Sequence, residues 1–151
     1  MKSVLALFAL AMGLMLGHGQ ALAEDATPVS QTAPVPDLAG TWTGPFKVIR
    51  THGVSEGMFT LRVLEQDGPL LKGEKSWETP GTEGNVAGVD VQSATEPLVG
   101  VVDFDGKSIY FAEVGDDGIH LGRLTSSDTL EVVYIEAGYA TAFRAALTRR
   151  K

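Results

Sequence analysis

Hydrophobic and polar residues alternate in short runs from about residue 38 to the C-terminus, and these runs are rich in Val, Ile, Phe, Tyr and Thr. In one run Phe59, Leu61 and Val63 alternate with a threonine and an arginine. A period of two residues is typical of a strand with one buried face. Almost nothing recurs at the helical period, so the pattern predicts an all-β domain. The expected strands are residues 41–50, 58–66, 70–78, 97–104, 107–114, 118–125, 129–136 and 140–149.

The connections between these runs favour tight hairpins. Asp67-Gly68, Asp105-Gly106 and Asp116-Asp117-Gly118 supply residues that tolerate the positive φ of such turns. Eight antiparallel strands in meander order can close into an up-and-down β-barrel, which removes the exposed sheet edges. A two-sheet β-sandwich is the alternative. Residues 86–92 are either a short ninth strand or part of a long glycine-rich loop.

Up-and-down connectivity sends alternate loops to opposite ends of the barrel. One end receives the tight turns at residues 67–69, 105–106 and 126–128, together with the start of the first strand. The other end receives residues 51–57, 79–96, 115–118 and 137–139. Binding residues concentrate on long loops of a rigid scaffold, so we expect any pocket to open at this second end.

The N-terminal residues differ from the rest of the chain. Residues 1–23 resemble a secretory signal peptide, with Lys2, an apolar run at 4–16 and the small-x-small site Ala21-Leu22-Ala23. Residues 24–37 form a linker rich in Pro, Ala and Thr, and residues 38–151 the barrel. The expected location is the periplasm or the exterior, with cleavage after Ala23 and no membrane insertion afterwards.

Composition narrows the possible chemistry. The chain has no cysteine, which excludes disulfides and thiolate metal sites. The net charge is −7, and it becomes −8 once Lys2 leaves with the signal peptide. A negative charge spread along the chain disfavours nucleic acid or an anionic membrane as partner.

Candidate ligand-binding residues are those projected to the second end of the barrel. They are Arg50, His52, Trp77, Glu113, His120, Glu136 and Tyr139. Trp77 is the strongest single candidate, because its strand has little other apolar character. A large aromatic residue there either fills the core or lines a site.

The same residues give little support for a metal site or for catalysis. His52 and His120 with Glu113 or Glu136 could form a two-histidine, one-carboxylate site, but none of these residues lies at a local ligand spacing, so we predict no metal and no cofactor. The chain lacks the common nucleophile, zinc and phosphate-loop motifs, so no catalytic residue is assigned. Glu113 and Glu136 could act as an acid–base pair only if both faced inward.

The segment Gly40-Thr41-Trp42-Thr43-Gly44 resembles the Gly-x-Trp start of the calycin superfamily, the lipocalins and avidins. The wider pattern also resembles uncharacterised lipocalin-like exported bacterial proteins. This resemblance implies an eight-stranded barrel whose first strand begins at the closed end with Gly40 and Trp42, covered by Arg149 or alternatively Arg144. The later tryptophan strands of avidins are missing, so biotin binding is not implied. Nor is there room for the helix that lipocalins carry before their last strand.

Three functional hypotheses follow. The first is an exported barrel that holds a small, partly apolar molecule at the end with the long loops. The second is a protein-interaction module, such as an inhibitor of an exported enzyme. The third is an isomerase or cyclase with its site in the barrel, which requires Glu113, His120 or Glu136 to lie within reach of one another. The sequence leaves the ligand and the oligomeric state open.

Overall fold

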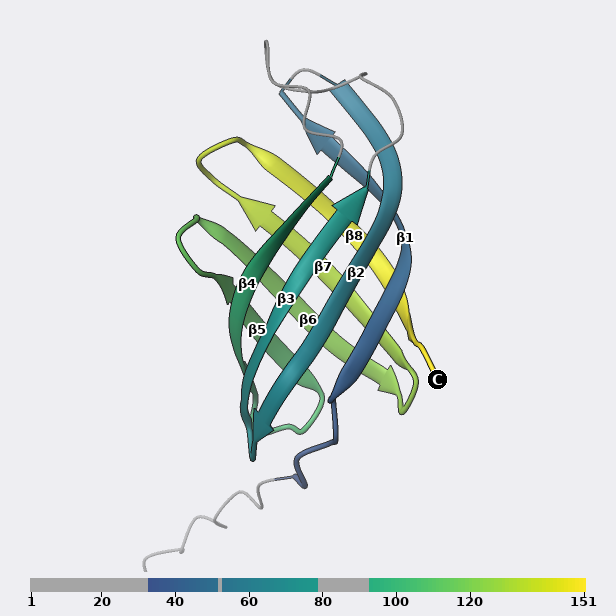
Figure 1. Cartoon of the computed structure of the whole chain (residues 1–151), viewed down its shortest axis with the longest axis vertical. Coiled ribbons are helices and arrows are strands. Elements are labelled where there is room, and N and C mark those ends of the chain that lie inside the picture. Colours follow the sequence, from purple (N-terminus) through teal and green to yellow (C-terminus); the bar gives the residue numbers. More distant parts are fainter. Residues whose placement is uncertain (1–32, 52, 79–92) are drawn as a thin grey trace, which may run out of the picture. The chain divides into compact units, whose positions relative to one another are not determined.

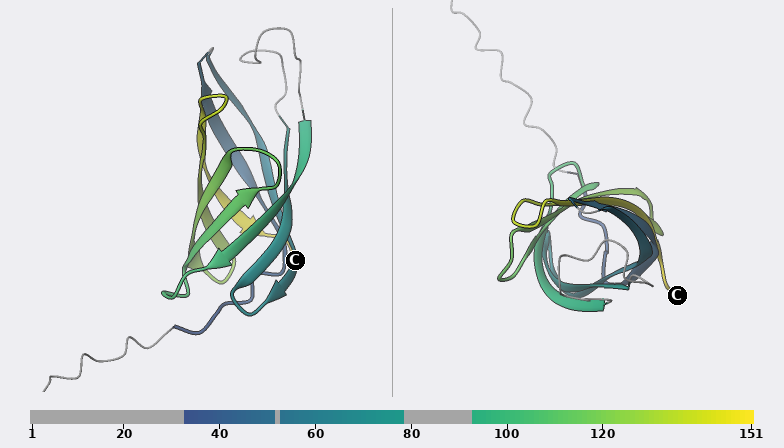
Figure 2. Two further views of the ribbon diagram at one scale, coloured as in Figure 1. Left: turned by 90° about the vertical axis from the view of Figure 1, so that its left-hand side faces the viewer. Right: turned by 90° about the horizontal axis from the view of Figure 1, so that it is seen from above.

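The computed structural model describes residues 33–51, 53–78 and 93–151, which form eight antiparallel strands. These are β1 (Gly40–Arg50), β2 (Gly53–Asp67), β3 (Leu70–Glu78), β4 (Ser93–Val102), β5 (Ser108–Glu113), β6 (Gly118–Ser126), β7 (Thr129–Glu136) and β8 (Thr141–Arg149). Each strand pairs with the next, and β8 returns to pair with β1, so the sheet closes into a barrel (Figures 1 and 2). The predicted all-β up-and-down barrel is confirmed, and the sandwich is excluded. No helix in the described part of the chain is long and apolar enough to cross a membrane.

The alternating residues of each strand build the core of the barrel. On β1, Trp42, Phe46 and Val48 point inward and are at most 5% exposed, while the alternate residues Thr43, Pro45 and Lys47 face outward. The neighbouring strands β8 and β7 contribute inward residues such as Leu147 and Leu130, which are also buried. A strand with one dry face and one wet face is the expected unit of a small closed barrel. The hydrophobic period therefore determines which side chains fill the interior.

The largest differences from the predicted strand boundaries are at the starts of β2 and β4. β2 begins at Gly53, and Gly53 pairs directly with Arg50 of β1. The predicted loop at 51–57 is therefore wrong. Gly53 and Gly57 have a weak intrinsic preference for strands, but their pairing with β1 keeps them in the sheet. β4 begins at Ser93 rather than at residue 97. Residues 86–92, predicted as either a short ninth strand or part of a long loop, lie outside the described residues.

The hairpin turns use glycine as predicted at two of three places. Gly68 and Gly106 have φ of 54° and 64°. In the β5–β6 turn the positive φ falls on Gly115, at 90°, and not on Gly118. Before β5, the Asp105 carboxylate accepts hydrogen bonds from the amides of Ser108 and Lys107, which lower the pKa of Asp105 to about 2. These local bonds fix the tight end of the barrel.

Trp42 closes the end of the barrel where β1 starts and β8 ends. These strand ends lie at the bottom of Figure 1. Its side chain is fully buried, and its Nε1 donates to the carbonyl of Leu38 at 3.0 Å. The Arg149 guanidinium lies 4.5 Å from the centre of the indole and donates to the carbonyl of Asp37. Arg144 is exposed on the outer wall, next to Lys47. Trp42 thus contacts both the segment before β1 and the end of β8.

The outer wall is polar on one side and apolar on another. Exposed ion pairs join β2 to β3, such as Arg62 with Glu74 at 2.5 Å. Across β4 to β7, by contrast, neighbouring outward positions are Val101, Tyr110, Leu121 and Val133, which are 39–44% exposed. This apolar row accounts for the apolar residues, such as Val133, at outward positions of β7.

Candidate functional site

A cavity of about 300 Å³ lies inside the barrel, at the end opposite Trp42. It is bounded by the strand ends at Arg50, Trp77, Glu113 and Glu136, together with the β7–β8 turn. The lining residues are Phe46, Val48, Arg50, Lys75, Trp77, Ala94, Glu96, Glu113, Asp116, Tyr134, Glu136, Tyr139, Thr141 and Phe143. The strand ends that form this rim lie at the top of Figure 1. This is the end at which the loop sorting places a pocket.

Aromatic rings form the floor of the cavity. The ring centres of Phe46 and Phe143 are 5.0 Å apart, and those of Tyr134 and Phe143 are 4.9 Å apart. Phe59 lies beneath, 5.0 Å from Phe143. Edge and offset contacts at these separations are favourable for aromatic pairs. The rings pack the middle of the barrel and leave the upper part hollow.

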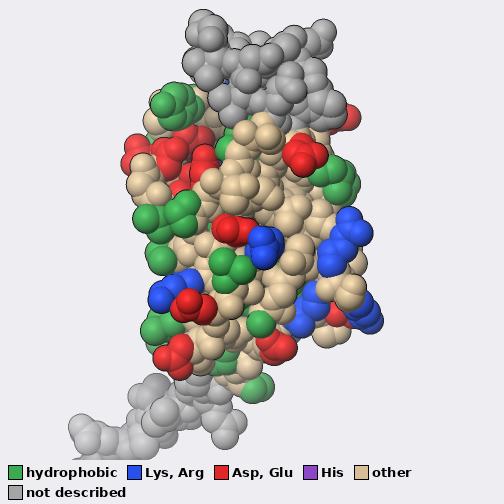
Figure 3. Space-filling view, viewed as in Figure 1, with side chains coloured by type: hydrophobic (Ala, Val, Ile, Leu, Met, Phe, Trp, Pro, Cys, Tyr) green, Lys and Arg blue, Asp and Glu red, His purple; other side chains and the backbone are tan. Residues whose placement is uncertain are grey.

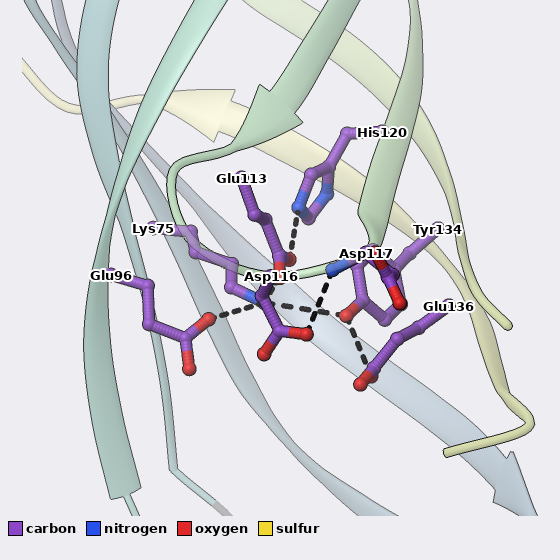
Figure 4. Close-up of polar contacts among 8 residues, drawn as sticks. All are labelled: Lys75, Glu96, Glu113, Asp116, Asp117, His120, Tyr134 and Glu136. Carbon is purple, nitrogen blue, oxygen red and sulfur yellow. Dashed lines mark hydrogen bonds and ion pairs between the residues drawn. The ribbon is translucent and has the colours of Figure 1, made fainter. Parts of the chain in front are cut away.

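Lys75 is the centre of a buried polar network in this hollow (Figure 4). Its ammonium contacts the Glu113 carboxylate, lies 2.8 Å from Glu96 and donates to the Tyr134 hydroxyl at 3.5 Å. It also lies 4.6 Å from the centre of the Tyr134 ring. The residue is only 4% exposed. Burial of an ammonium is tolerated where it is paired in this way.

Sequence reasoning missed Lys75. The signal was present, because the inward period of β3 runs through Leu71, Gly73, Lys75 and Trp77. A charged residue at an inward position of an otherwise buried face requires a partner. The partner Glu113 lies 38 residues away, on β5, and only the closed barrel brings the two together.

Glu113 is the most deeply buried acid of the network, with a side chain 1% exposed. Besides Lys75, it accepts a hydrogen bond from His120 Nε2 at 3.1 Å. Burial acts to raise the pKa of Glu113, but the hydrogen bonds from His120 and Lys75 and the charge of Lys75 outweigh it and hold the pKa below its ordinary value. Glu113 is therefore ionised. Its second oxygen, Oε2, has no hydrogen-bond partner among the described residues.

His120 lies behind Glu113 and does not line the cavity. Its ring is 2% exposed and packs between Phe59 and Tyr134. Burial, reinforced by the charge of Lys75, lowers the pKa of His120 despite the nearby Glu113. The imidazole is thus neutral near pH 7 and positions the carboxylate, since a neutral ring with its proton on Nε2 can donate to Glu113.

Gly118 makes room for the Glu113 carboxylate. A Cβ built on Gly118 would overlap the carboxyl carbon and both oxygens of Glu113. The residue lacks a positive φ, so the need for glycine here comes from this contact and not from the turn.

Substituting Gly118→Ala is expected to lower the free energy of unfolding by about 1–3 kcal/mol, because the added methyl group must displace a buried, paired carboxylate. Gly138→Ala is the matched control, since its nearest neighbour would be an Asp117 oxygen at the ordinary distance of 3.5 Å. Urea unfolding of both variants measures the difference. Equal stabilities would show that Glu113 can move without cost.

Glu136 and Tyr134 form a second polar pair, nearer the rim. The Tyr134 hydroxyl donates to Glu136 Oε2 at 2.8 Å. Burial raises the pKa of Glu136, and the charges of Asp116 and Glu113 add to it, although the Tyr134 hydrogen bond acts in the opposite direction. Burial also raises the pKa of Tyr134 strongly. Glu136 is thus the lining carboxylate best suited to exchange a proton.

The remaining predicted site residues fall in different places. Arg50 lines the cavity and donates to the Ser55 hydroxyl at 3.0 Å. Trp77 lines it from the end of β3, and Tyr139, 58% exposed, lines it from the β7–β8 turn. His52 lies outside the described residues. Within residues 33–51, 53–78 and 93–151, no three histidine or acidic side chains are grouped to hold a metal ion.

Comparison with known proteins adds two similar structures. No protein-family model matches the chain, and no curated protein matches it. A de novo designed fluorescence-activating β-barrel aligns with a TM-score of 0.47 and 14% identity, covering 74% of this chain and 93% of that one. A redesigned β-barrel aligns with a TM-score of 0.48 and 13% identity, covering 76% and 92%. The similarity concerns the barrel and extends to no ligand or activity, and the calycin resemblance stays a prediction.

Proposed function

We propose that this chain is an exported binding protein that holds one small, partly apolar molecule inside its barrel. The observation that carries the proposal is the cavity of about 300 Å³ between the aromatic floor and the rim. Ligand sites are typically concave and mostly apolar, with a few polar groups that fix orientation. Here Trp77, Phe143 and Tyr139 supply apolar surface, and Lys75 and Glu113 supply a preorganised polar group. Export rests on the N-terminal sequence alone.

Filling the cavity is expected to abolish binding. Ala94 lines the cavity directly opposite Trp77 on the neighbouring strand, so Ala94→Phe places a ring in the space for the ligand. Native mass spectrometry of protein purified from its own host should show a retained small molecule. We expect at least a tenfold smaller bound fraction in Ala94→Phe.

The matched control is Thr95→Phe, which adds a ring to the next residue, on the exposed outer face of β4. It should retain the ligand as the wild type does. Equal retention by all three proteins would place the bound molecule outside the barrel. The same spectra give the mass of the chain, and hence whether residues 1–23 have been removed.

An isomerase or cyclase is the second candidate function. It is supported by Glu136, a cavity-lining carboxylate with a raised pKa and a hydrogen bond to Tyr134. A carboxylate with a raised pKa is a stronger base than an ordinary one, as proton abstraction from a bound molecule requires. The Glu113–His120 pair is less suited, because His120 does not line the cavity and Glu113 is held ionised.

The protein-interaction hypothesis has less support. It would be favoured by a solid interior with an exposed apolar patch at the end with the long loops. The barrel instead has a hollow at this end, and the described apolar row lies on its outer wall.

A further inference from the structure

The charges that line the cavity are unequal. Two cations, Arg50 and Lys75, lie among four carboxylates, namely Glu96, Glu113, Asp116 and Glu136. Lys75 is already paired with both Glu113 and Glu96. Acidic side chains also gather at the upper left of Figure 3, the end that holds the β5–β6 and β7–β8 turns in Figure 1. A molecule that enters the cavity therefore meets an excess of negative charge.

Three carboxylates of the cavity have unused capacity. Glu113 is 93% buried, and its Oε2 has no hydrogen-bond partner within the described residues. A buried acceptor without a donor is costly, and a bound N–H group would remove this cost. Asp116 and Glu136 make no ion pair with any described cation. Both side chains line the same cavity as Lys75 and Tyr134, with which they are drawn in Figure 4.

Aromatic rings complete the environment of these acids. Trp77 and Tyr139 line the rim, and the face of a tryptophan or tyrosine attracts a cation. Lys75 makes such a contact with Tyr134 in this cavity. A bare metal ion does not suit the site, because the described acidic groups do not converge on one point. An anion could pair only with Arg50, which makes no ion pair with a described carboxylate, and it would face the four carboxylates of the lining.

We propose that the ligand of this cavity is a small organic cation, an ammonium group with N–H donors carried on a flat apolar body. The ammonium lies next to the Glu136 carboxylate, where the charges of Asp116 and of the free oxygen of Glu113 add to the attraction. The apolar body lies against Trp77, Tyr139 and Phe143. This inference rests on the proposed binding function and adds the charge of the ligand.

Three indole compounds of nearly equal size test the charge preference: tryptamine, a cation; tryptophol, which is neutral; and indole-3-acetate, an anion. Isothermal titration of the purified protein at about pH 7 and low salt gives each affinity. We expect tryptamine to bind at least tenfold more tightly than tryptophol, a difference of about 1.4 kcal/mol. Indole-3-acetate should bind more weakly than both.

Matched variants locate the effect. Glu136→Gln should weaken tryptamine binding about tenfold and leave tryptophol almost unchanged, and Asp116→Asn should act in the same direction. Glu131→Gln is the control, because Glu131 lies on the same strand, carries the same charge and faces outward. If Glu136→Gln disturbs folding, as seen by circular dichroism, the exposed Asp116 provides the test.

The possible outcomes separate the two proposals. If tryptamine and tryptophol bind equally and Ala94→Phe abolishes both, the cavity is a ligand site and the inference about charge is wrong. If none of the three compounds binds the wild type, the inference about charge is wrong. The proposed function fails as well only if the native mass spectra show no molecule that the wild type retains and Ala94→Phe loses. If Glu131→Gln weakens tryptamine as much as Glu136→Gln does, attraction to the overall negative charge explains the binding and overturns the inference.

Discussion

Replacing Lys75 by methionine is expected to lower the free energy of unfolding by about 3–5 kcal/mol, because the ionised Glu113 would be left buried without its partner. The two side chains are 5% and 1% exposed, so water cannot replace the lost ammonium. Chemical unfolding at about pH 7 measures the loss. Lys72→Met is the control on the same strand, since Lys72 forms only an exposed pair with Glu65 and its removal should cost at most about 1 kcal/mol.

The pH dependence of this variant identifies the cause. In the wild type the pKa of Glu113 is lowered, so ionised Glu113 stabilises the folded state at pH values above the ordinary carboxyl pKa. This stabilisation is lost as the pH falls through the pKa of Glu113 in the folded state. Without Lys75, the ammonium no longer opposes the effect of burial, and the pKa of Glu113 rises. The folded variant then binds a proton more readily than the unfolded chain, so its deficit should shrink as the pH is lowered from about 7 to about 5.

A second substitution tests the pair directly. Lys75→Met combined with Glu113→Gln removes both charges, and replacement of a whole buried pair is often nearly neutral. The double variant should recover at least half of the stability lost in Lys75→Met, as a double-mutant cycle would show. If the double variant is as unstable as the sum of the single variants, the two side chains are not coupled and the assigned ion pair is wrong.

Trp42→Ala is expected to cost about 3–5 kcal/mol of stability, because it removes a fully buried indole and leaves a cavity at the closed end. It also removes the hydrogen bond to Leu38 and the ring beneath Arg149. Thermal unfolding measures the effect. At a temperature where the variant remains folded, tryptamine should bind as it does to the wild type, since Trp42 does not line the cavity.

Trp77→Ala is the matched control, the same substitution at the other end of the barrel. Trp77 is only partly buried and lines the cavity, so we expect a smaller stability loss and a clear loss of binding. If Trp42→Ala instead left the melting temperature unchanged and abolished binding, the assignment of the closed and open ends would be reversed.

Several features of the site were readable from the sequence. Arg50, Trp77, Glu113, Glu136 and Tyr139 were selected because they lie near strand ends on one side of a meander, and all five line the cavity. That reasoning needs only the order of the strands. The same reasoning was wrong for His120, because strand order does not tell how far a side chain lies from the cavity. His120 faces the interior but lies behind Glu113 and does not line the cavity.

The predicted strand 97–104 ends two residues too late. Phe104 falls within that prediction, yet it lies in the turn after β4 and is 80% exposed. The strand ends at Val102, and Asp103 and Asp105 use their side chains to cap the turn, so the inward period stops before Phe104. A period of two predicts orientation only while the ladder continues.

The sequence by itself determined the all-β class, the eight strands, their antiparallel order and the end at which a cavity forms. These features depend on local properties, namely the alternation of side chains and the turn chemistry of Asp-Gly pairs. Only the tertiary structure decided the Lys75–Glu113–His120 network and the space that Gly118 leaves for it. Lys75 pairs across the sheet with Glu96, whereas Glu113 reaches it from β5 through the interior. Contacts across a barrel depend on register and closure together, and neither is encoded in any short stretch of the chain.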